Sequence, residues 1–167
     1  MSTSVLARPD AVSSTSDAPM MGHTSVAPRR RPALLGLLLA AIVLVAVSCD
    51  SSKANTDYAM VNGLRARYGV SPLARSAELD ARANEQAARM AAAGKLSHSP
   101  LPAGITPGWK MLGENVAMAS TVEQTQASLE ASPPHLQNLV NPVFNQVGIG
   151  VKTVNGYTWV VQIFAAR

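Results

Sequence analysis

Apolar residues with helical spacing predict a helix that ends near Gly69. They recur at intervals of three and four residues, the period of an amphipathic helix: Tyr58, Val61, Leu64 and Tyr68. A second, alanine-rich helix is expected between Ser76, a good N-cap, and Gly94, which can close a helix. Because so many of its residues are alanine, we expect this helix to approach the element beneath it closely.

Proline-rich stretches separate the next elements. Residues 97–110 contain three prolines and two glycines and are expected to form an irregular loop. A third helix should begin at Ser120 or Thr121, since Ser120 and Glu123 form a capping box, and run to about Ala131. A short helical turn over residues 136–140 should follow.

The last third of the chain predicts a β-hairpin. Residues 147–153 and 157–165 flank Asn155-Gly156, the strongest short signal for a type I′ turn. Both faces of the second strand are largely apolar, so we expect the hairpin to be covered on both sides. Helices early and a doubly covered sheet late predict an α+β layered sandwich.

An apolar segment near the N-terminus predicts export. Residues 33–47 carry no charge over fifteen positions and follow a run of three arginines, the order found in secretory signals. The segment is shorter than the about 20 apolar residues that a membrane-spanning helix needs. The basic region before it, residues 1–32, has no apolar periodicity and is expected to be disordered. A translation start at Met20 or Met21 would give a signal of ordinary length.

Cys49 is the only cysteine and follows three small residues, Ala46-Val47-Ser48. This pattern resembles the lipobox of bacterial lipoproteins, in which the cysteine is lipidated and becomes the first mature residue. We therefore predict a leader over residues 33–49, lipidation at Cys49, a polar tether over 50–55 and a working domain over 56–166. A plain signal peptide, or a short uncleaved anchor with Cys49 incidental, is the alternative.

The charge distribution argues against a nucleic-acid partner. The formal net charge is +4, but from Cys49 onward ten basic residues face eight acidic ones. No basic stripe of the kind that binds nucleic acid remains. The chain also lacks the G-x-S-x-G, glycine-rich phosphate-binding and H-E-x-x-H motifs, which argues against the hydrolases, nucleotide-binding proteins and zinc peptidases that carry them.

Four short motifs occur in order along the chain: Ser97-His98-Ser99, Gly113-Glu114-Asn115-Val116-Ala117, Ser132-Pro133-Pro134-His135-Leu136-Gln137-Asn138-Leu139 and Val147-Gly148-Ile149-Gly150-Val151. Together they resemble the signatures of the CAP superfamily, which groups cysteine-rich secretory proteins, antigen 5 and pathogenesis-related proteins with bacterial SCP-domain proteins. The resemblance extends from about Met60 to Phe164. It implies a three-layer α-β-α sandwich.

The resemblance also implies a central cleft in which two histidines and two glutamates converge. His98, Glu114 and His135 occupy three of these positions. The fourth, a glutamate in many members, falls on or near Ser132. Bacterial members often have glycine and arginine on either side of the second histidine, where this chain has Pro134 and Leu136, so the cleft should be less polar than is usual in the family.

Two roles are open for these side chains. Two neutral imidazoles, His98 and His135, can hold Zn²⁺ or another divalent cation weakly, because two protein ligands are too few for a tight site. Glu114 would then orient them or act as a base on bound water. Alternatively, the three side chains form a buried hydrogen-bond network that holds two loops together.

We therefore expect an exported domain of the bacterial cell envelope, membrane-anchored or secreted, that binds a small apolar or envelope-derived ligand such as a lipid. Its ligand-binding residues would be His98, Glu114 and His135. A weak divalent-metal-dependent hydrolase of the peptidase type, with Glu114 as the catalytic residue, is the alternative, because fold kinship does not decide the activity. Membrane contact is expected through the leader or a lipid on Cys49.

Overall fold

The computed structural model describes residues 33–167, with side chains from Cys49 onward. The elements in chain order are α1 (Ala33–Arg67), β1 (Ala74–Arg75), α2 (Ala77–Ala93), β2 (Met111–Ala119), α3 (Val122–Ala131), α4 (Pro133–Leu139), β3 (Gln146–Val154) and β4 (Tyr157–Ala166). None of the described helices is long and apolar enough to cross a membrane. The disorder predicted for residues 1–32 concerns residues outside the described part of the chain.

The four strands form one mixed sheet in the order β1-β3-β4-β2. β1 is parallel to β3, and the other neighbouring pairs are antiparallel. The predicted β3–β4 hairpin is confirmed, and it turns at Asn155 and Gly156, which both have the positive φ that a type I′ turn requires. This order leaves β2 at one edge of the sheet.

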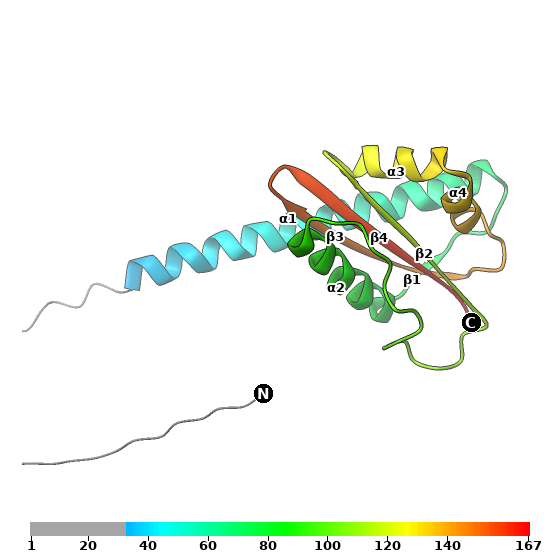
Figure 1. The fold of residues 1–167 in the computed structure, drawn as a ribbon, viewed down its shortest axis with the longest axis horizontal. Coiled ribbons are helices and arrows are strands. Elements are labelled where there is room, and N and C mark those ends of the chain that lie inside the picture. Colours follow the sequence, from blue (N-terminus) through cyan, green and yellow to red (C-terminus); the bar gives the residue numbers. More distant parts are fainter. Residues whose placement is uncertain (1–32) are drawn as a thin grey trace, which may run out of the picture.

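Helices cover both faces of the sheet, which confirms the three-layer α-β-α sandwich (Figure 1). α2 lies on one face and packs on Trp159, Val161 and Ile163 of β4. α1, α3 and α4 lie on the other face, where they enclose Val160 and Phe164 of the same strand. Successive residues of β4 therefore belong to two separate cores, as its apolar faces predicted.

α2 lies so close to β3 that the strand needs glycine beneath it. A Cβ on Gly148 would lie 2.1 Å from the carbonyl carbon of Leu79, and one on Gly150 would lie 2.1 Å from that of Ala83. Real Cβ atoms do not come this close to another backbone. The close approach that the alanine content predicted is therefore present, and glycines on the strand share in it.

The segment over residues 50–55, predicted to be a tether, is helical and belongs to α1. Its polar side chains hold the hairpin: Lys53 Nζ donates to Thr153 Oγ1 at 2.7 Å, and Lys152 Nζ donates to Asp50 Oδ2 at 3.3 Å. The prediction of a tether was wrong, because the polar side chains of Asp50 and Lys53 contact the β3–β4 hairpin and not solvent alone. The folded domain thus begins before residue 56.

The structure confirms the predicted ends of α2 and shows which residue caps α3. α2 is capped by Ser76 and closed by Gly94 in the left-handed conformation, as expected. α3 is capped by Thr121, the second of the two predicted starts, whose hydroxyl accepts from Gln124 N at 3.3 Å, and the capping box predicted at Ser120 was wrong.

Arg65 is fully buried near the C-terminal end of α1, and no carboxylate among the described residues pairs with it. Its guanidinium donates instead to four backbone carbonyls, at 2.7 to 3.2 Å: those of Ser71, Leu139, Asn141 and Phe144. A planar group with five donors suits this task, and a lysine ammonium does not. Arg65 therefore ties α1 to the loop that follows it, to the end of α4 and to the segment after α4.

We expect Arg65→Lys to lower the free energy of unfolding by about 3 kcal/mol, because buried carbonyls lose their donors. Urea unfolding followed by circular dichroism would measure the change. Arg67→Lys, two residues away on the exposed surface of α1, is the matched control and should stay within about 0.5 kcal/mol of the wild type. Equal losses in the two variants would contradict the role given to Arg65.

Candidate functional site

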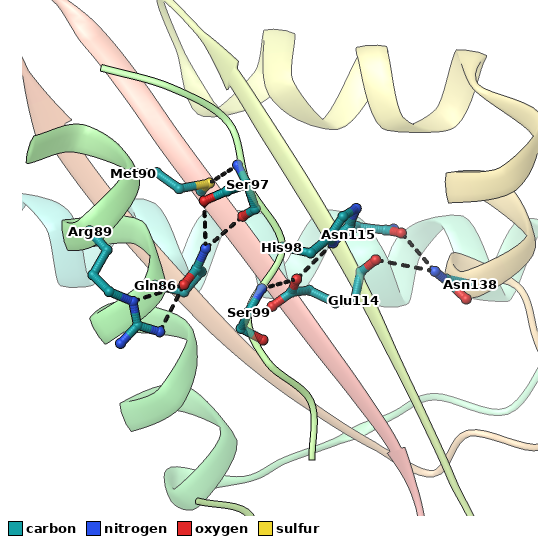
Figure 2. Close-up of polar contacts among 9 residues, drawn as sticks. All are labelled: Gln86, Arg89, Met90, Ser97, His98, Ser99, Glu114, Asn115 and Asn138. Carbon is teal, nitrogen blue, oxygen red and sulfur yellow. Dashed lines mark hydrogen bonds and ion pairs between the residues drawn. The ribbon is translucent and has the colours of Figure 1, made fainter. Parts of the chain in front are cut away.

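The segment that carries His98 is fixed to α2 before it reaches the sheet. Gln86, which is buried on α2, donates through Nε2 to the carbonyl of Ser97 at 2.6 Å. The backbone N–H of Ser97 donates to Met90 Sδ at 3.4 Å, and Arg89 donates to Oε1 of Gln86 and so fixes its amide. Figure 2 shows how these contacts place residues 97–99 beside β2.

Glu114 of β2 receives this segment. Its side chain is only 3% exposed, and its Oε1 accepts from His98 Nδ1 at 2.7 Å and from the backbone N–H of Ser99 at 2.8 Å (Figure 2). Because the carboxylate accepts, Nδ1 of His98 is the donor, and Nε2 keeps its lone pair in the neutral ring. The His98 side chain is 62% exposed, so a buried carboxylate orients an imidazole that solvent and ligands can reach.

The second carboxylate oxygen of Glu114, Oε2, is also buried, but it has no hydrogen-bond partner among the described residues. Oγ of Ser99 is also buried without a hydrogen-bond partner among the described residues, although the backbone N–H of Ser99 donates to Oε1 of Glu114. A buried polar atom without a partner costs about 1–3 kcal/mol, so such atoms are rare in native proteins. The site therefore has hydrogen-bonding capacity that the protein itself does not use.

His135 meets the same strand from the opposite face of the sheet. It lies in α4, and Asn115, the neighbour of Glu114, donates through Nδ2 to its backbone carbonyl at 3.1 Å. Its ring Nδ1 lies 2.8 Å from Ser132 Oγ. Within the described residues no hydrogen bond joins this ring to His98 or Glu114. The structure thus pairs His98 with Glu114 and gives His135 a different partner.

Sequence reasoning missed the polar network that supports β2 from the α1 side. Asn115 donates to Gln162 Oε1 of β4 at 3.2 Å, and Gln162 donates to Asp57 Oδ2 of α1 at 2.8 Å. Asn138 of α4 donates to Asn115 Oδ1 at 2.9 Å. Asn115 and Gln162 interrupt otherwise apolar strands, which was the one signal available. The fourth cleft position, which the resemblance placed on or near Ser132, has a hydroxyl where many members of the family have a glutamate.

The described residues around Glu114 provide only part of a metal site. Among the residues that the structure describes, no three His, Cys, Asp or Glu side chains are grouped to hold a metal. His98 has one property of a metal ligand, because a carboxylate holds its Nδ1 and leaves Nε2 for a cation. His98 alone has this arrangement, because the ring of His135 contacts Ser132, and the weak two-ligand site that the sequence suggested stays a prediction.

Two cavities in the described domain have volumes of about 400 Å³ and about 280 Å³. The larger lies between α1, α2 and β3, and the smaller lies beside the hairpin turn. Neither is lined by His98, Glu114 or His135. A ligand held by Glu114 would therefore not lie in either of these cavities.

The sequence model of the Cysteine-rich secretory protein family, CAP, matches residues 58–164, which is more than half of the chain. The chain belongs to the CAP family. No curated protein sequence shows significant similarity to it. Within the CAP match lie the whole His98–Glu114 site, His135 and the network around Asn115.

Solved structures share the CAP fold. An extracellular protein with an SCP domain from Bacillus anthracis is 21% identical (TM-score 0.60), and the match covers 71% of this chain and 41% of that protein. An outer surface protein of Borrelia burgdorferi is 17% identical (TM-score 0.63; 70% and 93% covered). A cysteine-rich secretory protein of Staphylococcus aureus is 18% identical (TM-score 0.59; 71% and 39%). The match spans about two fifths of the first and third proteins, and these identities show the fold alone.

Proposed function

We propose that this CAP protein is exported to the bacterial cell envelope, is anchored to the membrane by its leader or by a lipid on Cys49, and binds a small ligand at the His98–Glu114 site. The uncharged segment 33–47 and the small residues before Cys49 support export and anchoring. Cys49 is exposed, as a lipidation site must be. Structural neighbours described as an extracellular protein and an outer surface protein support the same location.

The observation that carries the ligand proposal is the buried Oε2 of Glu114, which has no partner among the described residues. A hydroxyl or amine donor that reaches this oxygen would form a strong, charge-assisted hydrogen bond with it. Half-buried Leu112 lies two residues earlier on the same face of β2, and half-buried Leu101 follows Ser99. A small apolar or envelope-derived molecule that carries one such donor therefore fits the site best.

The His98–Glu114 pair also supports the second candidate, a weak divalent-metal-dependent hydrolase. His98 and His135 would hold the ion, which would supply Lewis-acid chemistry, and Glu114 would be the catalytic base. However, Oε1 of Glu114 already accepts two hydrogen bonds. Ligand binding needs only Oε2 of Glu114, which has no partner among the described residues, so we rank ligand binding above hydrolysis.

The ligand proposal predicts that Glu114→Gln abolishes capture of one class of molecule. Purified full-length protein would be exposed to a lipid extract of bacterial envelopes and isolated again, and the retained molecules would be identified by mass spectrometry. We expect the wild type to retain at least about tenfold more than Glu114→Gln, because the amide cannot replace both carboxylate oxygens as acceptors. Glu130→Gln, on the surface of α3, is the control and should retain the wild-type amount. Equal retention by all three proteins would contradict the proposal.

Calorimetric titration with Zn²⁺ separates the two candidates. If the hydrolase proposal is right, the wild type binds Zn²⁺ weakly, and His98→Ala and His135→Ala both lose that binding. Absence of binding by the wild type, or unchanged binding by the two variants, would exclude the metal site and leave the ligand site standing.

A further inference from the structure

The hairpin turn, the last residues of β2 and the C-terminal end of α2 meet at the end of the domain where α1 leaves it (Figure 1). We call this surface the hairpin end, and it consists of Gly94–Leu96, Met118 and Val154–Tyr157. A cavity of about 280 Å³ opens there, lined in part by Met118, Val154, Tyr157 and Trp159.

Large apolar side chains are exposed at the hairpin end. Tyr157 is 51% exposed, Leu96 is 43% exposed and Met118 is 38% exposed. Tyr157 and Met118 line the same cavity. Gly94 lines this cavity too, and Leu96 lies two residues after it. Apolar surface grouped in this way marks an interaction site more often than scattered apolar residues do.

Lysines lie near this apolar surface. Lys95 belongs to the surface itself, while Lys53 and Lys152 lie on the α1 side of the hairpin, where they contact Thr153 and Asp50. Lys95 directly follows Gly94 and is exposed. Asp50, paired with Lys152, and Glu123, close to Lys53, are the acidic residues nearby, so the surface keeps a small positive excess. Tyrosine with apolar and lysine side chains is the composition of protein surfaces that lie at a bilayer interface.

The direction in which α1 leaves the domain indicates that the partner of this surface is a membrane. Asp50 Oδ1 accepts from the backbone N–H of Thr153 at 3.2 Å, which holds the hairpin against α1 one residue after Cys49. In the other direction α1 continues over residues 33–48, away from the domain (Figure 1), a length of about 24 Å. A lipid on Cys49 and an uncleaved apolar leader would both bring the hairpin end to the membrane before any other part of the domain.

We propose that the hairpin end is a membrane-contact surface that docks on anionic bilayers. Tyr157, Met118 and Leu96 enter the headgroup region, and exposed Lys95 contacts lipid phosphates. This inference rests on the anchoring in the proposed function and adds an orientation to it. β2 would then rise from the membrane and hold Glu114 about 14 Å beyond Met118, at the rise of an extended strand.

The two tryptophans of the chain make the orientation measurable. Trp159 lines the cavity at the hairpin end, and Trp109 precedes β2 at its opposite end. Full-length protein would be reconstituted in vesicles of phosphatidylcholine and phosphatidylglycerol with brominated acyl chains, which quench tryptophan by contact. We expect Trp109→Phe, which retains Trp159, to lose at least about twofold more fluorescence than Trp159→Phe, because an interfacial surface is buried about 5–10 Å deep.

Two equally exposed tyrosines provide the matched pair. Tyr157→Asp in the Trp109→Phe background should reduce the quenching of Trp159 by at least about half, since a carboxylate resists burial in lipid. Tyr68→Asp, near the end of α1, should leave it unchanged. If the protein floats with the vesicles but Trp159 is quenched no more than Trp109, the membrane-contact surface is excluded while the anchor stands. If the protein does not float with the vesicles, the anchor fails as well.

Discussion

Gly150→Ala is expected to destabilise the protein strongly, because the added methyl group would overlap the backbone of α2. The added Cβ would lie 2.1 Å from the carbonyl carbon of Ala83 and 2.2 Å from its oxygen. These atoms belong to the backbone of α2, which cannot rotate aside as a side chain can. Overpacking against side chains costs about 1–3 kcal/mol, so we expect a loss of at least about 4 kcal/mol against a total stability of about 5–15 kcal/mol.

Gly63→Ala is the control for this effect. Gly63 lies in α1, and a Cβ added there would have no neighbour within 4 Å. Alanine favours a helix over glycine, so this variant should be more stable than the wild type by about 0.5–1 kcal/mol. Chemical unfolding of both variants measures the difference. A Gly150→Ala protein that unfolds at the wild-type denaturant concentration would show that α2 does not lie against β3 at this residue.

The elements that the sequence predicted well are those whose signals are local. Ser76 and Gly94 bound α2 because a cap hydroxyl and a left-handed glycine act within one turn of helix. Asn155-Gly156 sets the hairpin for the same reason. The polar residues 50–55 were misjudged as a tether because their partners, Lys152 and Thr153, lie about a hundred residues away in the chain. Patterning shows that a residue is polar but not what it contacts.

The candidate site also contains contacts that the sequence predicted and contacts that it could not predict. The resemblance of ordered motifs placed His98 and Glu114 in one site, and the structure joins them by a hydrogen bond. No pattern indicated that His135 would pair with Ser132, since that depends on how α4 packs on the edge of the sheet. The Asp57–Gln162 contact joins residues 105 positions apart. Such a network has no signature along the chain except a polar residue in an apolar strand.

Asp57→Asn is expected to make the protein more stable at neutral pH and to remove part of the pH dependence of unfolding. Asp57 is fully buried in α1, its Oδ2 accepts from Gln162 Nε2 at 2.8 Å, and its Oδ1 has no partner among the described residues. Burial raises the pKa of Asp57 from 3.8 to about 7, although the hydrogen bond from Gln162 and the charge of Arg75 act in the opposite direction. Asparagine has the same shape, keeps an acceptor for Gln162 and never ionises.

The sign of the pH dependence follows from where the proton is held. Between pH 3.8 and about 7 the folded protein keeps the Asp57 proton that the unfolded chain has lost, so stability falls as the pH rises through this window and levels off above it. A pKa difference of this size corresponds to at most about 4 kcal/mol. Urea unfolding at several pH values across the window would show the wild type losing stability relative to Asp57→Asn as the pH rises. Parallel curves for the wild type and Asp57→Asn would mean that Asp57 is ionised in the folded protein at all these pH values, and that a cation or water satisfies its second oxygen.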